Sequence, residues 1–88
     1  MFYVYVLVSK RKRGQIYVGY TTDLTERFRR HNQGIVSSTR PYKPWKLIFY
    51  EAYLSELDAK RREKYFKTTK GRKALRLIFR DTLKLACQ

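Results

Sequence analysis

Long apolar runs and thiols are nearly absent from this 88-residue chain. No stretch approaches the roughly 20 apolar residues that a membrane span needs, and no basic segment precedes the apolar start, as it would in a signal peptide. The single cysteine, Cys87, cannot form an internal disulfide, and with only one histidine it cannot complete a zinc site. We therefore expect a chain of the reducing cytoplasm, without a membrane or a structural zinc ion as partner.

Acidic residues are also scarce, with seven Asp and Glu against 21 Lys and Arg and a formal net charge of +14. Such an excess favours a polyanionic partner: nucleic acid first, an acidic membrane surface second. The membrane is the weaker alternative, because no expected helix combines a long apolar face with a basic one. The cations expected to contact nucleic acid are Lys10, Arg11, Lys12, Arg13, Arg29, Arg30, Arg40, Lys43 and Lys67.

Three segments rich in β-branched and aromatic residues predict strands over 2–8, 15–20 and 45–53. The first two are joined by a short basic turn that contains Gly14, so antiparallel pairing is the simplest topology. The loop before the third strand contains Pro41 and Pro44, which should keep it out of regular structure.

Three helices complete the expected order β-β-α-β-α-α, an α+β fold with a small three-stranded antiparallel sheet. Asp23 and Ser55 can cap the first two helices, each with an acidic residue three positions later, as in a capping box. The third helix should cover 71–80, within a single domain of residues 1–80, and residues 81–88 should form a tail or a helix extension. Apolar spacing predicts that Leu24, Phe28, Ala59, Phe66, Leu75, Ile78 and Phe79 face the core.

Arg27 and His31 are neighbours on the first helix, at the expected border between core and solvent. They are either two members of a basic helix, with His31 favoured by the helix dipole, or parts of a site. Glu63 is the sharper anomaly, because it shares the inward face of the second helix, where a carboxylate needs a partner. That partner is either a nearby Lys or Arg or a Mg²⁺ ion that keeps most of its waters.

Most of the eight tyrosines are expected to be half-buried sheet residues. Tyr5 and Tyr17 differ, because strand pairing can bring them together and the following helix can bring Arg27 and His31 to their hydroxyls. Cations there should lower a tyrosine pKa and allow the phenolate to act as a general base on water. No Ser-His-Asp set, P-loop or dinucleotide-binding glycine pattern accompanies them.

These residues resemble the GIY-YIG nuclease domain over about residues 2–78. Tyr3-Val4-Tyr5 resembles the first motif and Tyr17-Val18-Gly19 the second. The helix "LTERFRRHNQ" and the segment "AKRREKYFK" resemble the family's Arg-His helix and its metal-binding helix. The resemblance is to the small stand-alone bacterial members; the excision-repair nuclease subunit and homing endonucleases carry the same module. One departure is Tyr3, which stands where the first motif usually has glycine and either narrows the approach or covers the sheet.

The resemblance implies an endonuclease that hydrolyses phosphodiester bonds with one Mg²⁺ or Mn²⁺ ion, on DNA rather than RNA. The implied catalytic residues are Tyr5, Tyr17, Arg27, His31 and Glu63, with Glu63 as the metal ligand. Either tyrosine could deprotonate the water, Arg27 would stabilise charge on the phosphate, and His31 would orient a tyrosine or relay its proton. The alternative is a nucleic-acid-binding module with the same fold and little cleavage.

Overall fold

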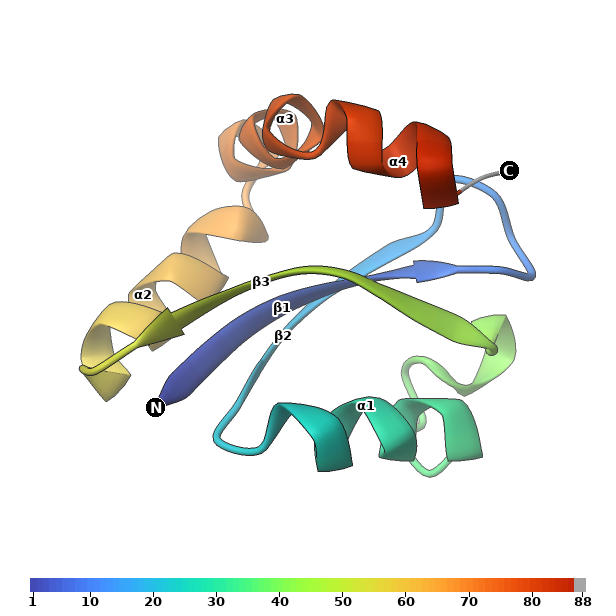
Figure 1. The fold of residues 1–88 in the computed structure, drawn as a ribbon, viewed down its shortest axis with the longest axis horizontal. Helices are drawn as coiled ribbons and strands as arrows, with labels where there is room; N and C mark the ends of the chain where they lie inside the picture. Colours follow the sequence, from blue (N-terminus) through green and yellow to red (C-terminus); the bar gives the residue numbers. More distant parts are fainter. Residues whose placement is uncertain (87–88) are drawn as a thin grey trace.

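The computed structural model describes residues 1–86 and places a three-stranded antiparallel sheet between helices (Figure 1). The strand order is β2-β1-β3, so the first strand is central. This arrangement confirms the predicted α+β fold. The elements are β1 (Phe2–Ser9), β2 (Ile16–Thr21), α1 (Leu24–Gln33), the 3₁₀ turn η1 (Arg40–Tyr42), β3 (Trp45–Tyr53), α2 (Glu56–Phe66), α3 (Thr69–Ile78) and α4 (Arg80–Ala86).

Strand β1 sets the geometry of the sheet because it pairs with both neighbours. Tyr5 lies opposite Gly19 in β2 and opposite Tyr50 in β3. The register against β3 shifts between Val6 and Leu7, which is the irregularity that one extra residue in a strand produces. The even and odd residues of β1 therefore face opposite sides of the sheet, as their alternation predicted.

Helices α2, α3 and α4 cover the face of the sheet that carries the even residues of β1 (Figure 1). Ala59 and Phe66 of α2 are fully buried there, as predicted. Leu83 of α4 packs against the same core. The buried members of this cluster are Val4, Val6, Val18, Ala59, Phe66, Leu75 and Phe79.

Helix α1 covers the opposite face, which carries Tyr5 and Leu7 (Figure 1). Leu24 and Phe28, the predicted apolar stripe of α1, pack against this second cluster. Trp45, at the start of β3, closes the cluster and is 2% exposed. The second face is small and aromatic, and it is the face from which the candidate site is built.

Local capping explains where the helices begin. Asp23 accepts the Glu26 backbone N–H at 3.1 Å, but the Glu26 carboxylate pairs with Arg29, so only half of the expected capping box forms. Ser55 accepts the Asp58 N–H as predicted. The third helix begins at Thr69 and not at 71, because the Thr68 hydroxyl accepts the Gly71 N–H at 3.0 Å.

Two further expectations about the chain were wrong. Ile78 is 50% exposed, because α3 ends there and the chain turns at Phe79, which takes the buried place one position later. The loop around Pro41 is not wholly irregular, since a 3₁₀ turn spans Arg40–Tyr42 with the proline in its first turn.

Cys87 lies outside the described residues. Among residues 1–86, no helix has the length and apolar character to cross a membrane.

Candidate active site

Gly19 lets the ring of Tyr5 cross strand β2. A Cβ atom at position 19 would lie 2.3 Å from the Tyr5 hydroxyl oxygen, a distance that no side chain can occupy. The small residue opposite Tyr5 therefore allows a fully buried tyrosine to extend over the neighbouring strand. Its hydroxyl reaches the side of α1 that carries Arg27 and His31.

His31 is fully buried in the last turn of α1, and not at the border with solvent as predicted. Its Nε2 lies 2.7 Å from the Tyr5 hydroxyl, and its Nδ1 lies 2.8 Å from the Thr39 hydroxyl. The Tyr17 ring centroid is 5.0 Å from the imidazole centroid. The segment before β3, which contains Thr39, covers the Nδ1 side of His31. Helical spacing within α1 does not reveal this cover, so it predicts more exposure for His31 than the structure shows.

Arg27 lies one helical turn before His31 and is half-buried. Its Nε donates to the Tyr5 hydroxyl across 3.4 Å, a long hydrogen bond. This contact places a permanently charged guanidinium beside the buried tyrosine. The structure thus brings Tyr5, Arg27 and His31 together at one hydroxyl group.

The protonation of this group differs from the sequence-based expectation. Burial raises the pKa of the Tyr5 hydroxyl to about 12, although the hydrogen bond from Arg27 acts in the opposite direction. Burial, and then the charge of Arg27, lower the pKa of His31 to about 4. The expectations of a lowered Tyr5 pKa and of a dipole-favoured imidazolium were therefore wrong, because desolvation outweighs the nearby charges. At neutral pH both groups are uncharged.

Tyr17 and Glu63 form the second half of the site, at the edge strand β2. The Glu63 carboxylate, 24% exposed, pairs with Lys67 across 3.2 Å. Lys67 also lies over the Tyr17 ring, with its ammonium 5.9 Å from the ring centroid. The expected ion pair of Glu63 is thus present, and through Lys67 it adjoins the half-buried Tyr17.

Glu63 fits the donor set that one hard cation needs. Within residues 1–86, no three His, Cys, Asp or Glu side chains cluster as a metal cage. A single carboxylate completed by water and substrate oxygens is a common way of holding Mg²⁺. Glu63 therefore suits a magnesium ion that arrives with a phosphate, provided that Lys67 moves aside.

A basic cluster adjoins the aromatic part of the site. The Lys10 N–H donates to the Pro44 carbonyl at 2.9 Å, which joins the turn between β1 and β2 to the segment before β3. Lys12 lies over the Tyr42 ring, and rings continue from Tyr42 through Trp45 to Tyr17 at centroid spacings of 6.4 Å. The cluster comprises Lys10, Arg11, Lys12, Arg40 and Lys43, all of them exposed. Arg13, which was also predicted to contact nucleic acid, lines a pocket with Arg76 and Leu83 on the side of α3 and α4.

The other predicted nucleic-acid contacts lie elsewhere. Arg29 and Arg30 are exposed on α1, and Arg29 is already paired with Glu26 at 2.6 Å. Lys67 lies on the opposite helical layer, beside Glu63. The predicted cations therefore do not form one patch, and those with acidic partners have less charge to offer a phosphate.

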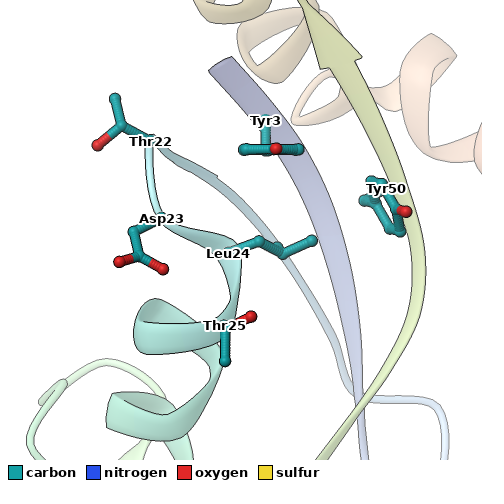
Figure 2. Close-up of a pocket in the computed structure, with 6 residues that line it drawn as sticks. All are labelled: Tyr3, Thr22, Asp23, Leu24, Thr25 and Tyr50. Atoms are coloured by element: carbon teal, nitrogen blue, oxygen red, sulfur yellow. The ribbon is translucent and has the colours of Figure 1, made fainter. Parts of the chain in front are cut away.

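A separate pocket of about 270 Å³ opens at the N-terminal end of α1. Figure 2 shows Tyr3 and Tyr50 on neighbouring strands beside it, with ring centroids 6.1 Å apart. The Tyr3 ring meets the Tyr50 ring edge-on, so it covers the sheet between β1 and β3 beside this pocket. The pocket contains no predicted catalytic residue; its lining is Tyr3, Thr22, Asp23, Leu24, Thr25 and Tyr50.

Sequence reasoning missed how the segment before β3 supports the site; Asn32 matched the resemblance, but its contact with Trp45 was not predicted. Thr39 is 1% exposed, although the sequence predicts it only as part of a loop. The Asn32 side chain donates to the Trp45 carbonyl at 3.0 Å, and the Trp45 indole donates to the Thr39 carbonyl at 2.9 Å. A threonine in a polar loop carries no periodic signal, so its contact with His31 could be found only from the fold.

Comparison with known proteins identifies the family of this chain. A model of the GIY-YIG catalytic domain matches residues 1–76, and that domain indicates the nuclease family. A UPF0213 protein of Clostridium perfringens is 35% identical over 85 residues, covering 96% of this chain and 89% of its own. UPF0213 proteins of Staphylococcus saprophyticus and Staphylococcus aureus are 33% and 35% identical over 75 residues, covering 84% of this chain and 92% of theirs. The chain belongs to the GIY-YIG catalytic domain family.

Proposed function

We propose that this chain is a metal-dependent endonuclease that hydrolyses phosphodiester bonds of nucleic acid, with DNA as the preferred substrate. The observation that carries the proposal is the convergence of Arg27, His31 and Tyr5 at one buried hydroxyl. Tyr17 and Glu63 adjoin this centre from the edge strand and from α2. A binding module would not need the Glu63 carboxylate at a surface that binds phosphate.

Tyr17 is the better general base of the two tyrosines. Tyr5 is 1% exposed, and its hydroxyl is engaged by His31 and Arg27. Tyr17 is half-buried on the edge strand β2, so it is more accessible than Tyr5. In its phenolate form Tyr17 accepts a proton from the water that attacks phosphorus.

The remaining groups act on charge. Arg27 neutralises the negative charge that builds on the phosphate oxygens in the transition state, and its contact with Tyr5 fixes where the guanidinium lies. Glu63 would hold the Mg²⁺ or Mn²⁺ ion, which when bound supplies positive charge for the leaving oxygen. Tyr5 and His31 keep the wall of the site rigid and electrically neutral.

A second candidate function rests on Lys67, whose ammonium occupies the Glu63 carboxylate at 3.2 Å. If this pair persists when nucleic acid binds, the Lys67 ammonium competes with a divalent cation for Glu63. The chain would then bind nucleic acid through its cations and cleave little.

The decisive experiment offers labelled single-stranded, duplex and branched DNA and RNA to the chain with Mg²⁺ or Mn²⁺, beside Glu63→Gln. We expect cleavage by the native chain and none by Glu63→Gln, with binding unchanged or slightly tighter because a negative charge near phosphate is removed. An ion-pairing role alone predicts a lower melting temperature for Glu63→Gln and intact cleavage. Salt-sensitive binding without cleavage of any substrate would favour the binding module.

A further inference from the structure

We propose that Thr39 is a positioning residue that holds His31 in the Nδ1–H tautomer and so directs the Tyr5 proton onto Nε2. The expected effect of Thr39 on cleavage rests on the proposed nuclease function. The tautomer of His31 can be tested whether or not the chain cleaves nucleic acid. Thr39 and His31 are 1% and 0% exposed, so water does not compete for the hydrogen bonds between them.

The direction of each hydrogen bond follows from what lies at the two ends of the chain of contacts. The Thr39 hydroxyl is 3.3 Å from the Val36 carbonyl, a long contact to an oxygen that can only accept and that also accepts the backbone N–H groups of Thr39 and Arg40. If Thr39 donates there, it accepts from Nδ1–H at 2.8 Å. His31 then has a free lone pair on Nε2, and the Tyr5 hydroxyl donates to it at 2.7 Å.

The other end is fixed by Arg27, which can only donate. Its Nε–H points at the Tyr5 oxygen, so that oxygen is an acceptor on the Arg27 side and a donor on the His31 side. The sequence of donors is therefore Arg27 to Tyr5 to His31 to Thr39 to the Val36 carbonyl. Every proton in the chain has an acceptor.

The reverse tautomer leaves a proton stranded. If Thr39 donated to Nδ1, then Nε2–H and Arg27 would both donate to the Tyr5 oxygen. The Tyr5 proton would then have no acceptor within the described residues, in a place that is 1% exposed. The cost of an unpaired buried donor corresponds to a factor of about 5 to 160 in favour of the first tautomer.

Thr39 is itself held in place by the fold. Its backbone carbonyl accepts the Trp45 indole N–H, and its N–H donates to the Val36 carbonyl at 3.2 Å. The threonine therefore joins the start of β3 to the end of α1. Through His31 it fixes the orientation of the Tyr5 hydroxyl, and hence the position of Arg27.

The chain has a single histidine, which makes the test direct. In the imidazole ¹⁵N spectrum of the untagged, folded chain at pH 7, we expect a protonated Nδ1 and an unprotonated Nε2. Thr39→Ser keeps the hydroxyl and should keep this pattern. Thr39→Val keeps the shape and removes the acceptor, so the Nε2–H form should become populated. Cleavage should fall about 10- to 100-fold in Thr39→Val, as for other groups that orient a functional histidine, and be restored in Thr39→Ser.

Several results would overturn the inference. A protonated Nε2 in the spectrum of the wild-type chain is sufficient to refute it. This measurement needs no variant, so the test remains possible even if Thr39→Val does not fold. An unchanged tautomer in folded Thr39→Val also overturns it, as does a changed tautomer with full cleavage. Absence of cleavage by the wild-type chain on every substrate refutes the nuclease proposal and with it the catalytic consequence, while the spectrum still decides the tautomer.

Discussion

Arg27 is the residue whose replacement separates catalysis from general attraction. Its guanidinium contacts Tyr5 through Nε, and a planar fork of donors suits a phosphate better than a lysine ammonium does. We expect Arg27→Lys and Arg27→Ala both to lose activity by on the order of 10²-fold or more. Binding should change little, because at most one cation among 21 is removed. Cleavage rates and binding constants on the same labelled substrate measure both.

Arg30 is the matched control for this prediction, since it is exposed on the same helix. Arg30→Lys should be silent in cleavage. If Arg27→Lys is equally silent and retains its metal dependence, Arg27 is a surface cation and its catalytic assignment fails.

His31 predicts how stability depends on pH. Its pKa is lowered from 6.5 to about 4 in the folded chain, by burial first and by Arg27 second. The unfolded state therefore binds the proton first as pH falls, so His31 lowers stability progressively from about pH 6.5 to pH 4. The shift corresponds to about 3 kcal/mol at the lower end.

Urea denaturation between pH 7 and pH 4.5 measures this decrease. His31→Asn removes the titrating group, so its unfolding free energy should depend less steeply on pH than that of the wild type, whatever its absolute stability. Equal slopes for the two chains would show that His31 is solvated enough to titrate normally.

The residues of the site were predictable in part, and the reason lies in how each one is encoded. Tyr5, Tyr17, Arg27 and His31 follow from strand alternation and helical spacing, and the structure does bring them together. The protonation of Tyr5 and His31 was not predictable, because it depends on burial to which a distant loop contributes. The same loop supplies Thr39, whose role no local pattern could reveal.

At the scale of elements, α2 and α3 meet closely at Gly71, and this contact helps to fix the helix that carries Glu63. A Cβ atom at position 71 would lie 1.9 Å from the Tyr65 carbonyl oxygen, which is backbone and cannot rotate away. We expect Gly71→Ala to destabilise the chain by about 1–3 kcal/mol or more, as overpacking does, despite the better helix propensity of alanine. Chemical denaturation measures it.

Lys70→Ala is a suitable control, since Lys70 is an exposed neighbour on the same helix and surface changes stay within about 0.5 kcal/mol. If Gly71→Ala is as stable as Lys70→Ala, the two helices can separate at no cost and the contact does not fix α2.

Elements were easier to predict than their ends. The third strand lies over 45–53 as predicted, because aromatic and β-branched residues fill it and Pro44 precedes it. The third helix starts at Thr69 because a threonine hydroxyl captures the Gly71 N–H, an interaction that the apolar spacing of Leu75 and Phe79 does not indicate. The spacing of apolar residues indicates where a helix lies, whereas capping side chains and turns determine the residues at which it begins and ends.

At the scale of the whole molecule, a charge of +14 predicts that nucleic-acid affinity falls steeply with salt. Each phosphate that a cation neutralises releases counterions, so log K falls with log salt in proportion to the number of phosphates neutralised. Neutralising six or more phosphates would reduce affinity by about 10³-fold or more between 50 and 200 mM salt. A flat dependence would show that the net charge is not the basis of binding.

The distribution of that charge predicts which cations contribute most to the salt dependence, because some cations pair with a carboxylate and others do not. Lys10 and Arg11 belong to the exposed cluster between the turn of the first hairpin and the segment before β3, whereas Arg29 already binds Glu26 at 2.6 Å. Replacing Lys10 and Arg11 together with Gln should lower the salt slope by about two, roughly one for each phosphate that is no longer neutralised. Arg29→Gln should lower it by less than one, since Arg29 must leave a carboxylate before it can bind a phosphate.

Fluorescence anisotropy of a labelled oligonucleotide at four or five salt concentrations measures both slopes. Equal effects per charge at the two places would mean that the chain attracts nucleic acid as a uniformly charged body, and that the cluster beside Tyr42 and Trp45 does not guide the strand toward Tyr17.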